Sequence, residues 1–207
     1  MKAIIFDLDG VLVNSKKVHL NALEEVLKSK GIIPTKEEMK TVFGFAVEDN
    51  IQKICKTRGL TCPLKEWSDE KRKIVLEKLR KIKPFPGTEE FLKYVKNKYK
   101  IAVASSSTLP EVEGALKGLA NYFDVMITRE AVKKPKPNPE IYLLAAKKLN
   151  VKPSECIAIE DSVAGVEAAK RSGMFCIAVL NSFPAKELKS ADVVVKDLRD
   201  ERLKQLC

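Results

Sequence analysis

No stretch of the 207-residue sequence approaches the ~18 consecutive apolar residues of a membrane-spanning helix. The sequence also has no CxxC pair, so neither a structural zinc site nor a thioredoxin motif has support. The apolar run at the N-terminus is short, reaches Asp7 after four apolar residues, and is followed by no small-residue cleavage site. We therefore expect no signal peptide, a cytoplasmic protein, and no membrane partner.

Arginine is scarce although the chain is basic, with 38 Lys and Arg against 28 Asp and Glu and a formal charge of +10. Only seven of the basic residues are Arg, and Lys alternates with Glu along every predicted helix. A nucleic-acid-binding protein usually concentrates its charge and uses Arg to grip phosphates. The pattern therefore predicts a solvated basic surface and no nucleic-acid partner. Separately from this pattern, we expect a monomer or weak dimer.

The five cysteines are an odd number and carry no metal-binding spacing. Cys156 and Cys176 lie in apolar runs typical of strands, so we expect buried free thiols. Cys55 and Cys62 are close enough in sequence to pair, but a cytosolic setting argues against a disulfide.

Short Ile- and Val-rich runs alternate with helical patterns through most of the chain. The strand-like runs mostly lack polar alternation, which is typical of strands buried on both faces of a parallel sheet. The predicted strands are 3–6, 101–104, 125–127, 157–159, 175–180 and 193–195, and the helices between them are 88–97, 111–119, 140–149 and 163–172. This alternation predicts an α/β fold, a Rossmann-like parallel sheet with right-handed crossovers.

Residues 15–83 interrupt the alternation, because they show helical periodicity and no convincing strand. The predicted helices there are 18–30, 36–43, 47–56 and 66–82. The pattern predicts an α-helical domain, 15–83, inserted into an α/β core made of 1–14 and 84–207.

Four predicted strands are followed by polar groups that suit phosphoryl transfer. Asp7 and Asp9 follow the first strand in the sequence DLDGV, although Asp-Gly alone also fits a solvated turn. A calcium loop is excluded, because its glycine and its final glutamate positions do not match. Ser105 and Ser106 follow the second strand, where a hydroxyl binds an anion or caps a helix.

The other two polar groups are a lysine and an acidic pair. Lys136 lies in the proline-rich stretch KKPKPNPEIY, which fits an aimed lysine and also an exposed basic connector. Glu160 and Asp161 follow a buried strand in EDSVAG, where such acids suit a hard divalent cation, while Asp161 or Ser162 alternatively caps the following helix. Because strand ends of a parallel sheet share one edge, we expect the four groups to lie together.

The ordered motifs DLDGV, Ser105, KPNPEIY and EDSVAG resemble those of the haloacid dehalogenase superfamily, which consists mostly of Mg²⁺-dependent phosphohydrolases. The helical insertion resembles the family's C1 cap, and the subgroup resembles phosphoglycolate phosphatases and β-phosphoglucomutases. Lys134 also fits the bare KPxP pattern, but only Lys136 places the following acid and aromatic residue at the family's offsets.

The resemblance implies a role for each of these residues. Asp7 would attack phosphorus and form an aspartyl-phosphate, while Asp9 would act as general acid and base. The Asp7 side chain, the Asp9 main-chain carbonyl and Asp161 would hold Mg²⁺, with Glu160 as a further or water-mediated ligand. The transferring phosphoryl group would be bound by Ser105, Ser106 and Lys136, and Lys136 would also keep Asp7 ionised.

The inserted domain would select the substrate, a small phosphorylated metabolite. His19, Gly44, Val47 and Lys71 are its candidate contacts, although His19 also fits a solvent-facing helix position. In mutase-like relatives an arginine shortly after the cap glycine supplies the contact to the distal phosphate of the substrate. The aligned position here is Val47, and a valine side chain cannot hydrogen-bond a phosphate. We therefore expect a phosphatase before a sugar phosphomutase, and either enzyme before a non-enzymatic binding protein on the same fold.

Overall fold

The structure is a computed structural model that describes residues 1–41 and 47–206, with the side chains of 40 and 41 left aside. The chain forms two compact units, one of residues 1–14 and 82–207 and one of residues 15–81. We call them the core unit and the cap unit and describe each by itself. Within the described ranges, no helix combines the length and the hydropathy of a membrane span.

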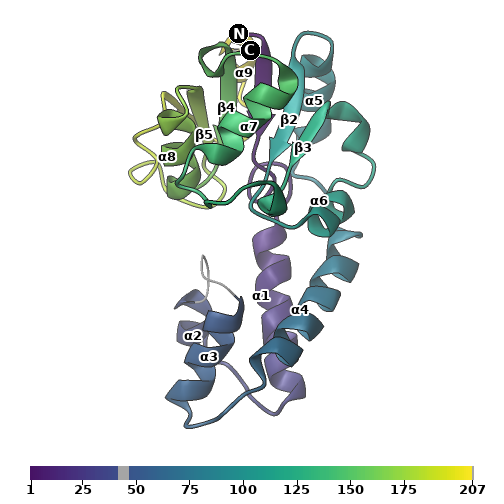
Figure 1. Cartoon of the computed structure of the whole chain (residues 1–207), viewed down its shortest axis with the longest axis vertical. Coiled ribbons are helices and arrows are strands. Elements are labelled where there is room, and N and C mark those ends of the chain that lie inside the picture. The colour runs from purple at the N-terminus through teal and green to yellow at the C-terminus, as the bar shows by residue number, and fades with distance from the viewer. Residues whose placement is uncertain (42–46, 207) are drawn as a thin grey trace. The chain divides into compact units, whose positions relative to one another are not determined.

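The core unit is built on a six-stranded, fully parallel sheet with the strand order β3-β2-β1-β4-β5-β6 (Figure 1). The strands are β1 (Ala3–Phe6), β2 (Lys100–Ala104), β3 (Val125–Ile127), β4 (Cys156–Glu160), β5 (Phe175–Val179) and β6 (Val193–Val195). All residues of β1 and β4 are buried, as expected for central strands with both faces covered. The predicted α/β class and strand positions are confirmed.

Helices cover both faces of this sheet. The core helices are α5 (Thr88–Lys96), α6 (Leu109–Ala115), α7 (Glu140–Leu149), α8 (Val163–Arg171) and α9 (Arg202–Leu206), with 3₁₀ turns at Ala120–Tyr122, Arg129–Ala131 and Pro153–Glu155. On one face α7 and α8 pack with Ile5 in a single apolar cluster. On the other face the ring of Phe6 meets those of Phe91 and Phe123 edge to face.

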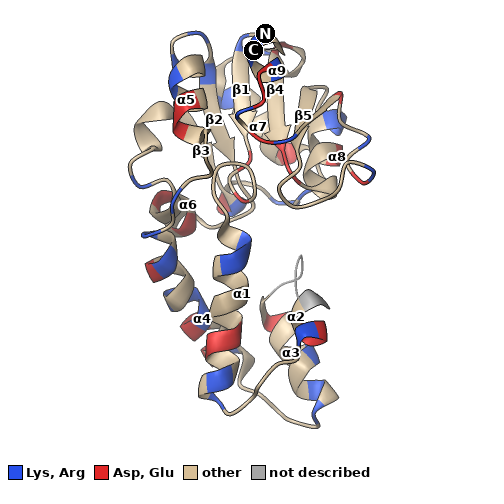
Figure 2. Cartoon of the chain, turned by 180° about the vertical axis from the view of Figure 1, so that it is seen from behind, with Lys and Arg blue, Asp and Glu red and all other residues tan. Residues whose placement is uncertain are grey.

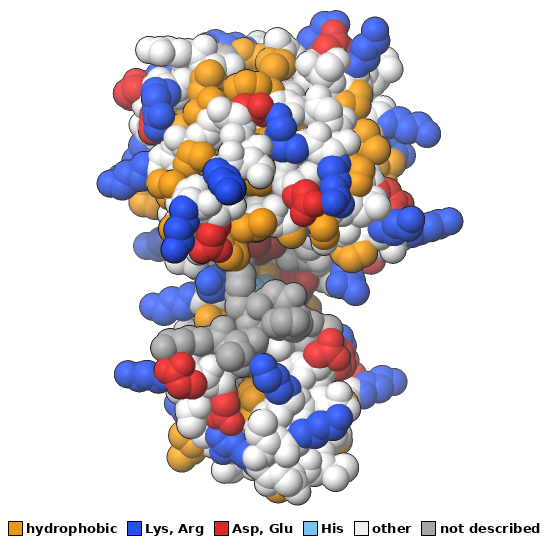
Figure 3. Space-filling model, turned by 90° about the vertical axis from the view of Figure 1, so that its left-hand side faces the viewer, with side chains coloured by type: hydrophobic (Ala, Val, Ile, Leu, Met, Phe, Trp, Pro, Cys, Tyr) orange, Lys and Arg blue, Asp and Glu red, His pale blue; other side chains and the backbone are white. Residues whose placement is uncertain are grey.

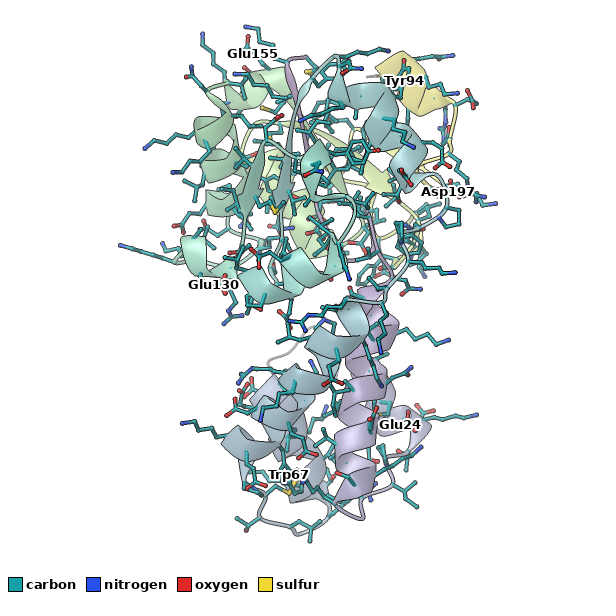
Figure 4. The ribbon with its side chains drawn as sticks, turned by 90° about the vertical axis from the view of Figure 1, so that its right-hand side faces the viewer. Glu24, Trp67, Tyr94, Glu130, Glu155 and Asp197 are labelled. Carbon is teal, nitrogen blue, oxygen red and sulfur yellow. A yellow bond between two sulfur atoms is a disulfide. The ribbon has the colours of Figure 1, made fainter. Side chains whose placement is uncertain are left out.

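Two core helices differ from the sequence prediction. Helix α6 begins at Leu109 rather than at 111, because the Glu111 carboxylate accepts the Thr108 N–H at 2.9 Å and closes the first turn. The short α9 was not predicted; the Tyr94 hydroxyl, on α5, donates to the Lys204 carbonyl at 3.1 Å and joins the two helices (Figure 4).

Among its described residues, the cap unit contains helices joined by turns and loops and has no strand. It contains α1 (Ser15–Ser29), α2 (Lys36–Thr41), α3 (Val47–Thr57) and α4 (Leu64–Leu79). An apolar cluster from α1, α3 and α4 forms its interior and includes Trp67. Basic and acidic residues are interspersed along the ribbon of both units (Figure 2), and the face in Figure 3 has no large area of one sign.

Cys55 and Cys62, whose pairing the sequence left open, form a disulfide beside Trp67 (Figure 4). The turn between α3 and α4 brings their Cα atoms to 6.2 Å, within the range that a disulfide spans. The expected cytosolic setting argues against a disulfide, but the local geometry favours the bond. Cys156 and Cys176 are buried free thiols, as predicted.

Candidate active site

The polar residues that follow β1, β2 and β4 meet at the carboxyl edge of the sheet with a lysine from the loop before α7. The Lys136 ammonium lies 3.0 Å from Asp7 Oδ1 and 2.7 Å from Glu160 Oε1. It also donates to the Ala104 carbonyl, at the end of β2, at 3.1 Å. The Lys136 side chain is only 7% exposed, so this is a buried, fully hydrogen-bonded cation.

The loop before α7 is fixed by its own side chains, which explains how Lys136 is aimed. The Glu140 carboxylate accepts the backbone N–H groups of Lys133 and Lys134 at 3.1 and 3.0 Å. Asn138 accepts the N–H of Glu140 at 3.1 Å and so caps the start of α7. Lys136 rather than the exposed Lys134 reaches Asp7, in agreement with the choice made from the motif offsets.

Glu160 is completely buried, and both of its carboxylate oxygens are occupied by donors within the protein. Oε1 accepts from Lys136 and, at 2.7 Å, from the Tyr142 hydroxyl. Oε2 accepts the backbone N–H groups of Asp161 and Ser162 at 3.0 and 3.2 Å and the Ser162 hydroxyl at 3.1 Å. The Glu160 carboxylate, itself held by these donors, therefore keeps the Lys136 ammonium in a fixed position.

The spacing of the EDSVAG motif has a direct physical reason. The Ser162 hydroxyl, besides donating to Glu160, accepts the Gly165 N–H at 3.1 Å and caps α8, as one sequence alternative held. Any side chain at Gly165 would overlap the Glu160 carboxylate. Gly10 has a φ of +84° and packs against Asp161 in the same way, so both glycines permit close approach.

Asp161 is buried, and its Oδ2 accepts a hydrogen bond from Ser182, which follows β5. The next residue back, Asn181, donates to the Gly10 carbonyl at 2.8 Å and ties the same loop to the DLDGV turn. The sequence analysis did not identify Ser182. No motif marks it, and only the pairing of β4 with β5 brings it to this edge.

The charges of the cluster act on Asp7 in opposite directions. Burial raises the pKa of Asp7 well above its ordinary value; Lys136 lowers it, but the repulsion by Glu160, Asp161 and Asp9 adds to the burial. Lys136 therefore favours the ionised form of Asp7, while burial and the three carboxylates oppose that form. Burial and the charge of Glu160 likewise raise the pKa of Asp161, to about 7.

Lys136 and Glu160 show the opposite behaviour. Burial opposes the charge of Lys136, but Asp7 and Glu160 outweigh it, so the pKa of this ammonium is raised. Burial also opposes the charge of Glu160, yet Lys136 and the other donors hold its pKa below the ordinary value. The cluster thus contains one firm ion pair and two carboxyl groups that lack sufficient positive charge.

This imbalance is what a divalent cation would correct. Asp7, Glu160 and Asp161 each offer a carboxylate oxygen, and these oxygens lie within 4.8 Å of one another. Hard oxygen donors of this kind suit Mg²⁺ or a similar ion. Because Glu160 is already saturated by donors, Asp7 and Asp161 are the members that fit direct ligation.

Asp9 contacts the loop that follows β2. Its Oδ2 accepts hydrogen bonds from the Ser105 and Ser107 hydroxyls at 3.1 and 2.7 Å. Ser107 was not singled out from the sequence, because three consecutive serines give no sign of which one faces the carboxylate. Ser106 points elsewhere: it is exposed and lines a small pocket beside the loop before α7.

The candidate cap residues lie in the cap unit or outside the described residues. The Lys71 ammonium, on α4, is buried and lies 2.8 Å from His19 Nδ1 on α1. This pairing differs from the solvent-facing alternative for His19. Val47 is half-buried at the first position of α3, and Gly44 falls outside the described residues.

Comparison with known proteins places these motifs in a family. The family model described as haloacid dehalogenase-like hydrolase matches residues 4–179. A phosphorylated carbohydrates phosphatase from Thermotoga maritima is 35% identical over 181 residues, which cover 84% of this chain and 82% of that protein. β-Phosphoglucomutase from Bacillus subtilis is 31% identical over 216 residues, which cover 100% and 94% of the two chains.

A solved structure extends the likeness to three dimensions. The crystal structure of β-phosphoglucomutase from Clostridium difficile superposes with a TM-score of 0.82 at 28% identity, and covers 100% of this chain and 95% of that one. The similarity therefore includes the helical cap unit as well as the sheet.

Proposed function

This chain belongs to the haloacid dehalogenase-like hydrolases, and we propose that it is a Mg²⁺-dependent phosphatase that hydrolyses a small phosphorylated metabolite through an aspartyl-phosphate. The observation that carries the proposal is the buried cluster of Asp7, Asp161 and Glu160 around the Lys136 ammonium. Buried carboxylates with raised pKa values next to a fixed lysine are costly to maintain and are typical of functional sites.

In the proposed reaction Asp7 is the nucleophile. A carboxylate oxygen of Asp7 forms a bond to phosphorus while the bond between phosphorus and the ester oxygen breaks. Asp9 donates a proton to the departing oxygen. In the second half, Asp9 accepts a proton from water as the water oxygen attacks phosphorus, and the Asp7 carboxylate is released.

Four other residues bind the phosphoryl oxygens or support those that do. Lys136 and the Ser105 hydroxyl lie at the end of β2 and beside Asp7, within reach of a phosphoryl group bound there. Ser106 belongs to the same loop. We assign Glu160 to the placement of Lys136, with any contact to a metal ion made through water.

Mg²⁺ would be held by the side chains of Asp7 and Asp161 and the main-chain carbonyl of Asp9. When bound, it supplies positive charge that offsets the repulsion between these carboxylates and the substrate phosphate. The raised pKa values of Asp7 and Asp161 support this assignment, because they show that the two groups lack sufficient positive charge within the protein.

A sugar phosphomutase is the second candidate, and the similarity to β-phosphoglucomutases favours it. A mutase would use Asp7 and Asp9 in the same way but return the phosphoryl group to a sugar rather than to water. We rank hydrolysis first because Val47, at the aligned position for a cap grip on a distal phosphate, carries no hydrogen-bonding group.

The test is release of phosphate from a panel of phosphorylated metabolites, with and without Mg²⁺. We expect Mg²⁺-dependent turnover that Asp7→Asn lowers by about a thousandfold or more while the fold is retained. Asp9→Asn is expected to lose turnover and keep its affinity for Mg²⁺. Substantial turnover by folded Asp7→Asn would refute the proposal, and faster conversion of β-glucose 1-phosphate to glucose 6-phosphate than phosphate release would favour the mutase.

A further inference from the structure

A small pocket on the core unit adjoins the candidate active site and has a basic side that the proposed reaction does not use. Its volume is about 100 Å³, and Ser106 and Lys136 line the part next to the catalytic cluster. Arg129 and Lys133 line it as well, from the segment between β3 and α7. Arg129 is anchored beside the site because its backbone N–H donates to the Ser107 carbonyl at 3.1 Å.

The charged groups of Arg129 and Lys133 have no partner within the described part of the chain, either in an ion pair or in a side-chain hydrogen bond. This is unusual for an arginine here. Most other arginines form ion pairs with acidic residues, namely Arg58, Arg72, Arg171, Arg199 and Arg202. Two unpaired cations on one pocket create a local excess of positive charge.

The neighbouring acids Glu130 and Glu140 interact electrostatically with Arg129 and Lys133, but they form no ion pair with them within the described residues, because their oxygens accept hydrogen bonds from other groups. Glu130, labelled in Figure 4, accepts from the Thr128 hydroxyl at 2.6 Å and from the Leu109 N–H at 3.2 Å. Glu140 accepts the two backbone N–H groups that fix the loop before α7. The pocket lining includes neither acid and no other carboxylate.

The rest of the lining is apolar and comes from Val132, Pro135 and Ile141. A site of this size has room for a few water molecules, and therefore for a carboxylate or a phosphate with a short carbon stem. An arginine guanidinium with free N–H groups matches the two oxygens of such an anion, and a lysine adds a mobile point charge.

We propose that this pocket binds a second anionic group of the substrate, a carboxylate or a phosphate, close to the phosphoryl group that Asp7 attacks. The preferred substrates are then phosphate esters with a second negative charge a few atoms away. The inference rests on the proposed phosphatase function, since it names the substrate class of that same site.

Binding and turnover are measured separately, so that a failure of either proposal is recognised. Binding is measured by calorimetry on Asp7→Asn, with two pairs of ligands: 3-phosphoglycerate with glycerol 3-phosphate, and fructose 1,6-bisphosphate with fructose 6-phosphate. The first pair differs in a carboxylate and the second in a phosphate. Turnover with Mg²⁺ is measured for the same esters and for p-nitrophenyl phosphate, which has no second anionic group.

We expect the doubly anionic member of at least one pair to bind more tightly. Replacing both cations, Arg129→Gln with Lys133→Gln, should reduce that preference by about tenfold or more, mainly as a rise in KM in the turnover assay. The pair that responds identifies the second group as a carboxylate or a phosphate. Lys134→Gln is the matched control, because Lys134 is an exposed neighbour that does not line the pocket.

An equal affinity within both pairs, or a preference that survives the double substitution, would show that the pocket is not an anion subsite. Absence of p-nitrophenyl phosphate hydrolysis by the unmodified protein is a different outcome. It would count against the phosphatase proposal, while the calorimetry would still decide whether the pocket binds an anion.

Discussion

The core unit and the cap unit bury polar groups in different ways. At the carboxyl edge of the sheet, Asp7, Lys136, Glu160 and Asp161 are nearly inaccessible and interlocked. The main cluster of the cap interior is apolar and is reinforced by a disulfide from α3 to the turn before α4, although the cap unit also buries Lys71 beside His19. Burying charge costs free energy and burying apolar surface supplies it. The difference indicates that the core edge is organised for chemistry and the cap interior for stability.

The largest effect is expected from removing the buried cation. Lys136→Met leaves Glu160 and Asp7 without their positive partner, so turnover should be lost and the free energy of unfolding should fall by about 3–5 kcal/mol. Urea unfolding without Mg²⁺ measures the fall, with Lys134→Met as the exposed control. A loss below about 1 kcal/mol would mean that the ion pair matters little to the core.

Removing the disulfide should affect the cap unit alone. The bond closes a loop with a sequence separation of 7, and the double variant Cys55→Ala with Cys62→Ala should lose about 2–3 kcal/mol of stability. Hydrogen exchange should become faster in residues 47–79 and stay unchanged in the core strands. A reductant should reproduce the effect in the unmodified chain and do nothing further to the variant. Equal hydrogen-exchange rates for residues 47–79 in the unmodified protein and in the double variant would contradict the stabilising role of the disulfide in the cap unit.

Tyr142→Phe sharpens the account of the core edge, because it removes one donor and keeps the packing. The Tyr142 hydroxyl donates to the same Glu160 oxygen that holds Lys136. We therefore expect the free energy of unfolding to fall by about 2 kcal/mol and turnover to be several-fold slower. Tyr122→Phe is the control, since that hydroxyl meets the exposed Glu89 at 3.5 Å. When Tyr142→Phe is combined with Lys136→Met, it should lower the free energy of unfolding by little more. Full additivity of the two losses in stability would contradict positioning through Glu160.

The smallest effect is the pH dependence of metal affinity. The raised pKa of Asp161, about 7, means that a proton occupies this carboxyl below neutral pH and must leave when a cation binds. Mg²⁺ affinity should therefore fall as pH drops below about 7, by up to about tenfold per unit for one proton. Calorimetric titration at pH 6, 7 and 8 checks this. An affinity that is constant over this range would mean that Asp161 is not a ligand or is ionised without metal.

The sequence was a reliable guide to the sheet and to the ends of its strands. Buried parallel strands have a strong local signal, and β1, β3 and β6 begin and end where the pattern predicts. Asp7, Ser105, Lys136 and Asp161 follow from the same reasoning, because parallel strands bring their carboxyl ends together.

Residues whose importance depends on distant partners could not be predicted in this way. Ser182 belongs to no motif, and Tyr142 entered the sequence analysis only as the aromatic residue of KPNPEIY. Both gain their roles from contacts with Asp161 and Glu160. The charge balance at Asp7 also needs the three-dimensional arrangement, since the proximity of four charged groups sets its pKa. The pairing of Cys55 with Cys62 could not be decided from the sequence, because it depends on the geometry of the turn between α3 and α4.

The central claim is that Asp7 becomes covalently phosphorylated, and trapping tests it most directly. The protein is mixed rapidly with a turning-over substrate and Mg²⁺, quenched with acid, and treated with borohydride, which reduces an aspartyl-phosphate to homoserine. Peptide mass spectrometry then reads position 7. The account predicts homoserine at this position only when substrate and Mg²⁺ are both present. Unmodified Asp7 at every quench time during active phosphate release, or modification at another residue, would contradict it.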